Sequence, residues 1–209
     1  MSHALMVDLE TLSKLPTAAI SSIGAVIFEP HSDWIGESFH LHVSLENCQR
    51  HGLTIDASTV TWWLGQDDTA RQTLIVGQLD AAPLITALEA FSNFFPAGAE
   101  IWCNGNSFDL PILANAYHAI GAETPWAFYN ERDLRTLKGL NKGARIQREG
   151  THHNALDDAI HQARLVQHIL SAGASSIRRG RSGWRRLVQH ILHFNPDVDA
   201  CGRPSPSRP

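Results

Sequence analysis

Three short stretches near the start of the chain have the hydrophobic pattern of β-strands. Residues 4–9 form an almost continuous apolar run, residues 19–29 are rich in β-branched side chains, and residues 34–43 alternate apolar side chains with two histidines. Successive side chains of a strand point to opposite faces of a sheet, so these stretches are typical of strands with a buried face. The turns between them are short, which predicts an antiparallel meander.

The rest of the chain has a mostly helical pattern. Asp56 can cap the first helical segment, and Pro96 ends the second. In order, we expect one or two short helices within 56–76, a helix at 79–95, a strand at 100–103, a helix at 107–120, weak strand content at 126–128, a short helix at 133–140, a basic loop at 141–151 and a helix at 155–170. This order predicts an α/β fold, with a sheet of mixed direction flanked by helices.

Length and composition indicate one domain of ordinary size. The chain has 209 residues, of which 43% are hydrophobic, and this is enough for a full core. Its three cysteines show no paired spacing, so we expect neither disulfides nor a zinc site, and a cytoplasmic location. The first apolar run is too short for a signal peptide, and no stretch is long enough to span a membrane.

Charge divides the chain into two parts. Residues 1–170 contain 10 basic and 19 acidic residues, a net charge of −9, whereas residues 171–209 contain 7 basic and 2 acidic residues, a net charge of +5. The seven residues at 164–170 recur identically at 186–192, which indicates either a duplication or altered reading of the terminus, or a basic arm that grips nucleic acid. We expect a folded domain over 1–172 and a basic, disordered or weakly helical tail over 173–209.

Acidic residues follow two of the predicted strands. Asp8 and Glu10 are one residue apart at the end of the first strand, so they point to the same face, and Asp109 opens the helix after the strand at 100–103. Like charges at a strand end destabilise the fold unless a cation lies between them. This pattern therefore favours a divalent metal with oxygen ligands. Taken alone, Asp8 and Glu10 fit a solvated strand end equally well, and Asp109 fits an ordinary helix cap.

A fourth acid and a histidine complete the pattern. Residues 152–159 read His-His-Asn-Ala-Leu-Asp-Asp-Ala and open the last predicted helix, with His153 five residues before Asp158. Together with Asp8-Leu9-Glu10-Thr11-Leu12, Trp62-Trp63 and Asp133-Leu134-Arg135-Thr136-Leu137, this pattern resembles the DEDDh superfamily of 3′–5′ exonucleases. The resemblance covers about residues 4–170 and is greatest to the bacterial and phage exoribonuclease-like branch.

The resemblance implies a ribonuclease H-like fold and a two-metal mechanism. Asp8, Glu10, Asp109 and Asp158 would bind two Mg²⁺ or Mn²⁺ ions, and His153 would take the proton from the attacking water. The expected substrate is single-stranded RNA, cleaved from its 3′ end to nucleoside 5′-monophosphates, and a homodimer is possible. Residues expected to contact the substrate are Thr11, Leu12, Trp63, Gln66, Asn104 and Phe108.

Some features leave alternatives open. Many DEDDh enzymes have Asn four residues before the third acid, where this chain has Gly105. Only one of two neighbouring tryptophans on a helix is expected to face a given surface, and core packing is the commoner fate of such a residue. The competing functions are a 3′–5′ DNA exonuclease of phage recombination or proofreading type and a catalytically silent nucleic-acid-binding module. Dinucleotide-binding, Walker and nucleophile-elbow motifs do not occur in the sequence.

Overall fold

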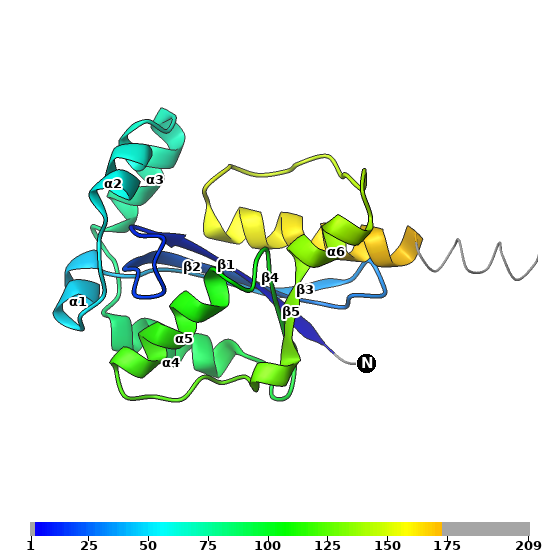
Figure 1. Cartoon of the computed structure of the whole chain (residues 1–209), viewed down its shortest axis with the longest axis horizontal. Coiled ribbons are helices and arrows are strands. Elements are labelled where there is room, and N and C mark those ends of the chain that lie inside the picture. Colours follow the sequence, from blue (N-terminus) through cyan, green and yellow to red (C-terminus); the bar gives the residue numbers. More distant parts are fainter. Residues whose placement is uncertain (1–2, 173–209) are drawn as a thin grey trace, which may run out of the picture. The chain divides into compact units, whose positions relative to one another are not determined.

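The fold is built on one five-stranded sheet, seen in a computed structural model that describes residues 3–172 (Figure 1). The predicted tail at 173–209 lies outside the described residues. The strands are β1 (Ala4–Thr11), β2 (Ile20–Phe28), β3 (Ile35–His42), β4 (Glu100–Cys103) and β5 (Glu131–Asp133), in the order β3-β2-β1-β4-β5. Strands β3, β2 and β1 are antiparallel, whereas β4 and β5 run parallel to β1. The predicted mixed sheet, with an antiparallel meander first, is therefore confirmed.

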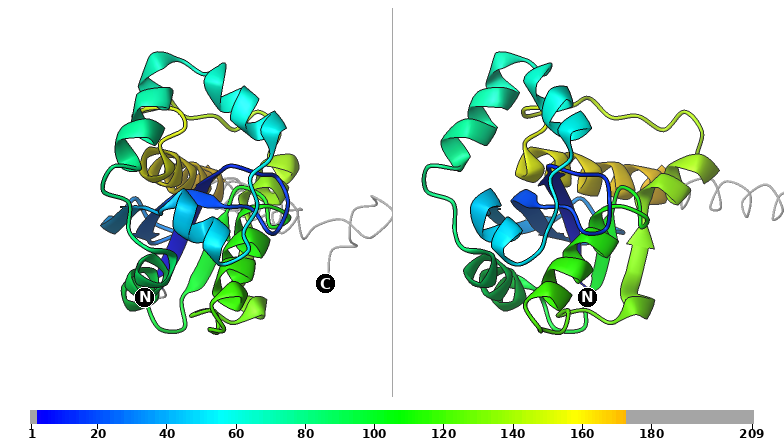
Figure 2. Two further views of the ribbon diagram at one scale, coloured as in Figure 1. Left: turned by 90° about the vertical axis from the view of Figure 1, so that its left-hand side faces the viewer. Right: turned by 60° about the vertical axis from the view of Figure 1, so that its left-hand side comes forward.

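Helices cover both faces of the sheet. They are α1 (Leu45–Arg50), α2 (Ala57–Leu64), α3 (Asp68–Gly77), α4 (Leu84–Phe94), α5 (Asp109–Ala119) and α6 (Leu134–Leu140), followed by a C-terminal helix over residues 155–172. In Figures 1 and 2 the C-terminal helix, yellow to orange, lies on one face, and α4 and α5 lie on the other. This is the layered α/β arrangement that the sequence predicts.

Strand β1 sends its side chains alternately into two hydrophobic clusters. Leu5, Val7 and Leu9 pack in the cluster that contains α4 and α5. Ala4 and Met6 pack in the opposite cluster, which contains α6 and the C-terminal helix. Asp8 and Glu10 continue this even-numbered series, so strand geometry points both toward the side of the sheet that carries the C-terminal helix.

The C-terminal helix begins unusually close to the sheet. Asp8 of β1 pairs with Gly24 of β2, and a Cβ atom placed on Gly24 would lie only 2.1 Å from the carbonyl carbon of Ala155. No side chain fits at that distance, so a glycine is needed at this point. The absence of a side chain lets the first turn of the helix reach the strand beside Asp8.

Several element boundaries differ from those expected. Helix α1 forms where the sequence pattern predicted no element. Strand β5 forms at Glu131–Asp133, after the short 3₁₀ turn at Phe128–Asn130, instead of at the predicted 126–128. Helix α4 begins at Leu84 because Ala82 pairs with Val43 as an isolated bridge. Asp56 precedes α2 but does not cap it with its side chain, which instead accepts a 2.6 Å hydrogen bond from Ser13 Oγ.

None of the helices between residues 3 and 172 combines the length and the apolar character that crossing a bilayer needs.

Candidate functional site

Three carboxylates meet at the end of β1. One oxygen each from Asp8, Glu10 and Asp158 lies within 4.8 Å of the other two. Two of these acids come from neighbouring even positions of β1, and the third comes from the first turns of the C-terminal helix, 148 residues further along the chain. The close approach at Gly24 brings that helix to the strand, so a packing feature of the sheet assembles the cluster.

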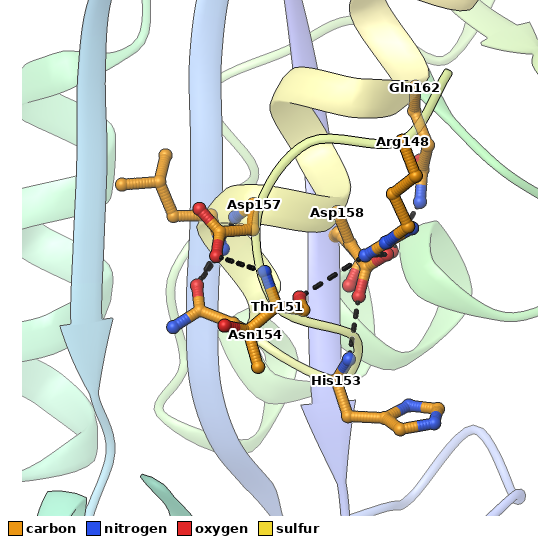
Figure 3. A network of polar contacts seen from close by, with 9 residues as sticks. Arg148, Thr151, His153, Asn154, Asp157, Asp158 and Gln162 are labelled. Carbon is orange, nitrogen blue, oxygen red and sulfur yellow. Dashed lines mark hydrogen bonds and ion pairs between the residues drawn. The ribbon is translucent and has the colours of Figure 1, made fainter. Parts of the chain in front are cut away.

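Capping interactions fix the start of the C-terminal helix and the direction of Asp158 (Figure 3). The side-chain oxygen of Asn154 accepts hydrogen bonds from the backbone N–H groups of residues 156 and 157. Oδ2 of Asp158 accepts a 3.0 Å hydrogen bond from the backbone N–H of His153. The neighbouring Asp157 accepts a 2.7 Å bond from the N–H of Thr151 and points away from the cluster. Asp158 is thus the acid that the helix directs toward Asp8.

The fourth acid lies in the same cleft but outside the group of three. Asp109 is buried at the first residue of α5, and its Oδ1 accepts a 3.3 Å hydrogen bond from the backbone N–H of Leu9. A cleft of about 250 Å³ is lined by all four acids together with His153 and Gln162. We call this the acid cleft.

The acids in the cleft repel one another. Burial, and then the charges of Asp109, Glu10 and Asp158, raise the pKa of Asp8 well above its ordinary value. Burial and the charges of Asp158 and Asp109 raise the pKa of Glu10 to about 8. Burial also raises the pKa of Asp109 to about 7, although the N–H of Leu9 and the charge of Arg135 oppose the rise. A cluster of buried carboxylates that repel one another favours the binding of cations.

The donor set fits a divalent metal. All the ligand atoms are carboxylate oxygens, which hard ions such as Mg²⁺ and Mn²⁺ prefer, and three of them converge within 4.8 Å. The repulsion between the buried carboxylates would be relieved by positive charge at their centre. Asp8, Glu10 and Asp158 are thus the residues that could hold a cation, with Asp109 beside them.

Two polar side chains that sequence analysis did not place at the site contact the acids directly. Gln162, one turn after Asp158 on the C-terminal helix, donates a 2.7 Å hydrogen bond from Nε2 to Oδ1 of Asp8. Arg148, which sequence analysis placed in the basic loop at 141–151, lies 2.5 Å from Oδ1 of Asp158. The helical spacing of Gln162 from Asp158 was the available signal for the first, because residues four apart share a helix face. No local pattern indicated the second.

His153 lies at the rim of the acid cleft. Its backbone has a φ of 61°, in the left-handed region that non-glycine residues rarely adopt. Its ring is 5.0 Å from that of Trp62 and 6.0 Å from that of Trp63, in edge-to-face arrangements. Both tryptophans therefore contact one histidine, whereas the sequence led us to expect only one of them to face a given surface.

A second, larger cleft adjoins the first. Its volume is about 530 Å³, and its walls include Trp62, Trp63 and Phe108. Glu10, Phe108 and Arg135 line both this aromatic cleft and the acid cleft, so the two clefts share a wall. Flat aromatic surfaces beside a cluster of acids offer a place for a nucleobase next to a phosphate site.

The two tryptophans differ in exposure. Trp62 is 44% exposed, whereas Trp63 is only 4% exposed and donates a 3.0 Å hydrogen bond from Nε1 to the carbonyl oxygen of Thr11. Sequence analysis favoured Trp63 as a substrate contact. In the structure Trp62 has the free surface, and Trp63 is the residue that joins α2 to β1.

The other expected substrate contacts are distributed unevenly. Thr11 lines the aromatic cleft, with its hydroxyl donating to the carbonyl of Ser13. Asn104 and Phe108 line the acid cleft, and Oδ1 of Asn104 is buried without a partner among the described residues. Leu12 is buried in a small hydrophobic cluster with Trp63 and Ala70.

Gln66 lies apart from this group. Its side-chain amide donates to the carbonyl of Trp62 on its own helix, and it lines neither cleft. The structure therefore brings Thr11, Trp63, Asn104 and Phe108 to the clefts, but not the side chains of Leu12 and Gln66.

The surroundings of residue 105 explain why a glycine stands there. Its φ of 151° disfavours other residues, and a Cβ atom there would lie 3.3 Å from Nε of Arg135. The guanidinium of Arg135 donates to the carbonyl of Asn104 at 3.0 and 3.2 Å. In this chain an arginine from α6 thus occupies the space beside the position where many DEDDh enzymes have Asn.

Comparison with known proteins agrees with this geometry. Residues 3–170 match the family model described as the 3'-5' exoribonuclease Rv2179c-like domain. The exodeoxyribonuclease of Enterobacteria phage T4 is 25% identical over 157 residues, which cover 63% of this chain and 68% of the phage protein.

Solved exonuclease structures share the fold. E. coli exonuclease I in complex with a dA16 oligonucleotide has a TM-score of 0.60 and 12% identity over 81% of this chain, which spans 41% of that protein. The nuclease domain of 3'hExo, a DEDDh family member bound to rAMP, has a TM-score of 0.56 and 15% identity, over 82% of this chain and 93% of that domain.

The resemblance noted in the sequence and the ribonuclease H-like fold are thereby confirmed. The family match extends over most of the chain and contains all four acids and His153. The chain therefore belongs to the family of 3'-5' exoribonuclease Rv2179c-like domains.

Proposed function

We propose that this protein is a two-metal 3′–5′ exonuclease that hydrolyses single-stranded RNA to nucleoside 5′-monophosphates. The observation that carries the proposal is the convergence of Asp8, Glu10 and Asp158 within 4.8 Å, with Asp109 in the same cleft. The preference for RNA is supported by the family match, which is to an exoribonuclease domain over residues 3–170. The aromatic cleft, which shares a wall with the acid cleft, supports a single-stranded substrate.

In this proposal Asp8, Glu10 and Asp158 hold one Mg²⁺ or Mn²⁺ ion, and Asp109 supports a second. When bound, such ions make water a stronger nucleophile at neutral pH and neutralise charge on the attacking and leaving oxygens. The protein keeps Asp8 in a fixed direction through the rigid strand and the hydrogen bond from Gln162.

The remaining side chains bind the substrate and accept the proton. Trp62 and Phe108 receive the terminal base in the aromatic cleft, and the rim position of His153 lets its imidazole take the proton from the attacking water. The contacts of the His153 ring with Trp62 and Trp63 limit the orientations of the imidazole.

The test is a time course with two 5′-labelled single strands of identical sequence, one RNA and one DNA. Each is incubated with Mg²⁺, with Mn²⁺ and with chelator, using the Asp8→Asn variant as the control for contaminating nucleases. We expect a metal-dependent ladder that shortens from the 3′ end, faster for RNA. Release of label as a mononucleotide at the earliest times would indicate cleavage from the 5′ end and reject the proposal, as would equal cleavage by Asp8→Asn.

A 3′–5′ DNA exonuclease is the second candidate. It is favoured by the 25% identity to the exodeoxyribonuclease of phage T4 over 157 residues. The same time course decides between the two, because faster shortening of the DNA strand would replace RNA as the substrate while leaving the metal site in place.

A homodimer, which the family resemblance suggests, is part of the proposal. Exposed apolar side chains on α2, α3 and the turn after α3 support it, because exposed apolar area is what a second copy would cover: Leu64, Ile75, Val76 and Leu79. Light scattering on a sizing column tests this point. A monomer mass at micromolar concentration would remove the dimer and leave the catalytic proposal unaffected.

A further inference from the structure

Arg148 reaches from the loop at 141–151 to Asp158, one of the carboxylates that line the acid cleft. Its terminal guanidinium nitrogen lies 2.5 Å from Oδ1 of Asp158 and donates at 3.2 Å to the carbonyl of Thr151 (Figure 3). Both partners of this ion pair are largely shielded from water, with side chains 20% and 17% exposed. Shielding of this kind strengthens the pair compared with one at the surface.

This contact engages one of the two oxygens that Asp158 offers to the proposed metal. Oδ2 of Asp158 already accepts the N–H of His153, and Oδ1 accepts Arg148. Among residues 3–172, Arg148 supplies the one basic side chain within 4.0 Å of a carboxylate oxygen of the four acids. A divalent ion on Oδ1 would face the guanidinium charge at close range, so the two cations compete for Asp158.

We propose that Arg148 is the internal counter-ion of the metal site: it neutralises Asp158 in the metal-free protein and is displaced when the divalent ion binds. The inference rests on the proposed function, because it assumes that the acid cleft binds a divalent metal. It assigns to Arg148 control of metal affinity, a role distinct from that of a metal ligand.

Few hydrogen bonds hold Arg148 on Asp158, so a metal ion can displace it. The same terminal nitrogen makes both contacts of the guanidinium, while Nε of Arg148 is buried without a hydrogen-bond partner among the described residues. A bidentate arginine–carboxylate pair would use two nitrogens and two oxygens and would be stronger. Displacement of Arg148 from Asp158 therefore breaks fewer hydrogen bonds than displacement of a bidentate arginine would.

The backbone around Arg148 is anchored on its C-terminal side. Glu149 forms an ion pair with Arg164, and the N–H of Thr151 donates to Asp157. Between them, Gly150 has a φ of 82°, and a Cβ atom there would lie 2.5 Å from Cγ of Asp157. These contacts tie the loop to the C-terminal helix, so the exchange moves the arginine side chain while the loop backbone stays in place.

Competition of this kind has a measurable consequence. When only a fraction of the protein has a free Asp158, the apparent metal affinity is lowered by that fraction. Removing the arginine should then tighten metal binding while destabilising the metal-free protein, because the acids lose their nearest cation. A side chain that serves only to shape the site would lower both the stability and the metal affinity when removed.

The experiment is calorimetric titration of the full chain with Mn²⁺, combined with thermal melts in chelator. The variants are Arg148→Gln and, as the matched control, Arg145→Gln, which removes an exposed arginine three residues away in the same loop. We expect Arg148→Gln to bind Mn²⁺ about three- to tenfold more tightly than wild type, because the population bound to Arg148 is released. Its melting temperature in chelator should fall, and Arg145→Gln should change neither value.

Each outcome has a clear meaning. Unchanged or weaker Mn²⁺ binding by folded Arg148→Gln would overturn the inference, and so would equal tightening by Arg145→Gln, which would indicate a general charge effect. Absence of Mn²⁺ binding by the wild type would overturn the proposed function and this inference with it.

A second measurement uses the wild-type protein, in case Arg148→Gln does not fold. The nitrogen–proton signal of the buried Nε of Arg148 is assigned by its loss in Arg148→Lys and followed during titration with Mg²⁺. We expect it to shift or to exchange faster with water as the ion binds. A signal unchanged at saturating Mg²⁺ would show that the arginine stays on Asp158 and would overturn the inference.

Discussion

Nε2 of Gln162 donates a 2.7 Å hydrogen bond to Oδ1 of Asp8, joining two residues that are 154 positions apart in the sequence. The contact orients a central acid of the site without cancelling its charge, because an amide is neutral. Oε1 of Gln162 is buried without a partner among the described residues, so the side chain is held at some cost in stability. We regard Gln162 as a positioning residue for Asp8.

Replacing Gln162 by Met should weaken metal binding with little change in side-chain volume. Loss of an outer contact that orients a metal ligand typically lowers metal affinity or activity by about 10–100-fold. Calorimetric titration with Mn²⁺ measures the affinity. The matched control is Gln167→Met, which removes a buried glutamine on the same helix whose amide donates to the carbonyls of Glu29 and Trp34, away from the acid cleft. Equal loss of affinity in both variants would contradict the positioning role.

Replacing Asp8 by Asn should abolish turnover and stabilise the metal-free protein. Burial and the charges of three neighbouring acids raise the pKa of Asp8, so its ionised form destabilises the fold near neutral pH. For a domain of this size, about 1 kcal/mol of relief raises the melting temperature by about 2–4 °C. Melts in chelator measure the gain. A variant that melts below wild type in chelator would indicate that repulsion at this site is already compensated.

The stability of the metal-free protein should fall as pH rises from about 4 to about 8. The pKa of Glu10 is raised to about 8, that of Asp109 to about 7, and that of Asp8 is raised as well, so across this range the folded state binds more protons than the unfolded state. Stability then decreases with pH until these groups are ionised in the folded state, and levels off above that point.

Melts at several pH values in chelator test this sign. Because other groups also titrate, the useful quantity is the melting temperature of Asp8→Asn minus that of wild type. We expect this difference to widen from about pH 5 to about pH 8, since the variant lacks one of the repelling charges. Saturating Mg²⁺ should raise the wild-type melting temperature more at the higher pH. A difference that narrows with pH would contradict the assigned direction of the pKa shifts.

Local pattern was enough to predict the framework of the site. Alternation along β1 placed Asp8 and Glu10 on one face, and the even-numbered series from Ala4 explains why they point toward the C-terminal helix. What alternation could not supply was the distance between that face and the helix. It depends on Gly24, which in the sequence is only one glycine within an apolar strand.

Contacts between distant segments were the part that the sequence did not reveal. Helix α1 has only six residues and buries a single one, Cys48, so its hydrophobic pattern is too weak to detect. Arg148 belongs to a loop whose composition is that of a solvated charge run, and its pairing with Asp158 depends on how the loop folds back onto the helix. Such contacts are determined by tertiary packing, which periodicity does not encode.

The two neighbouring tryptophans should respond differently to replacement. Trp62 is 44% exposed in the aromatic cleft, whereas Trp63 is buried and bonded to the carbonyl of Thr11. Trp62→Ala should weaken binding of single-stranded RNA by about 1–3 kcal/mol, the usual contribution of one base stacked on an aromatic ring. Its melting temperature should change little. Trp63→Ala should instead cost about 3–5 kcal/mol of stability, as large truncations in a core do.

RNA binding is measured by fluorescence anisotropy with Ca²⁺ in place of Mg²⁺ to limit hydrolysis, and stability by urea unfolding. Trp62→Phe is the matched control, because it keeps an aromatic face and should retain most of the affinity. Stacking would be rejected if Trp62→Ala and Trp62→Phe lost affinity equally. If Trp62→Ala bound RNA as tightly as wild type, the exposed ring would serve only to pack against His153, and the base would have to lie on Phe108 instead.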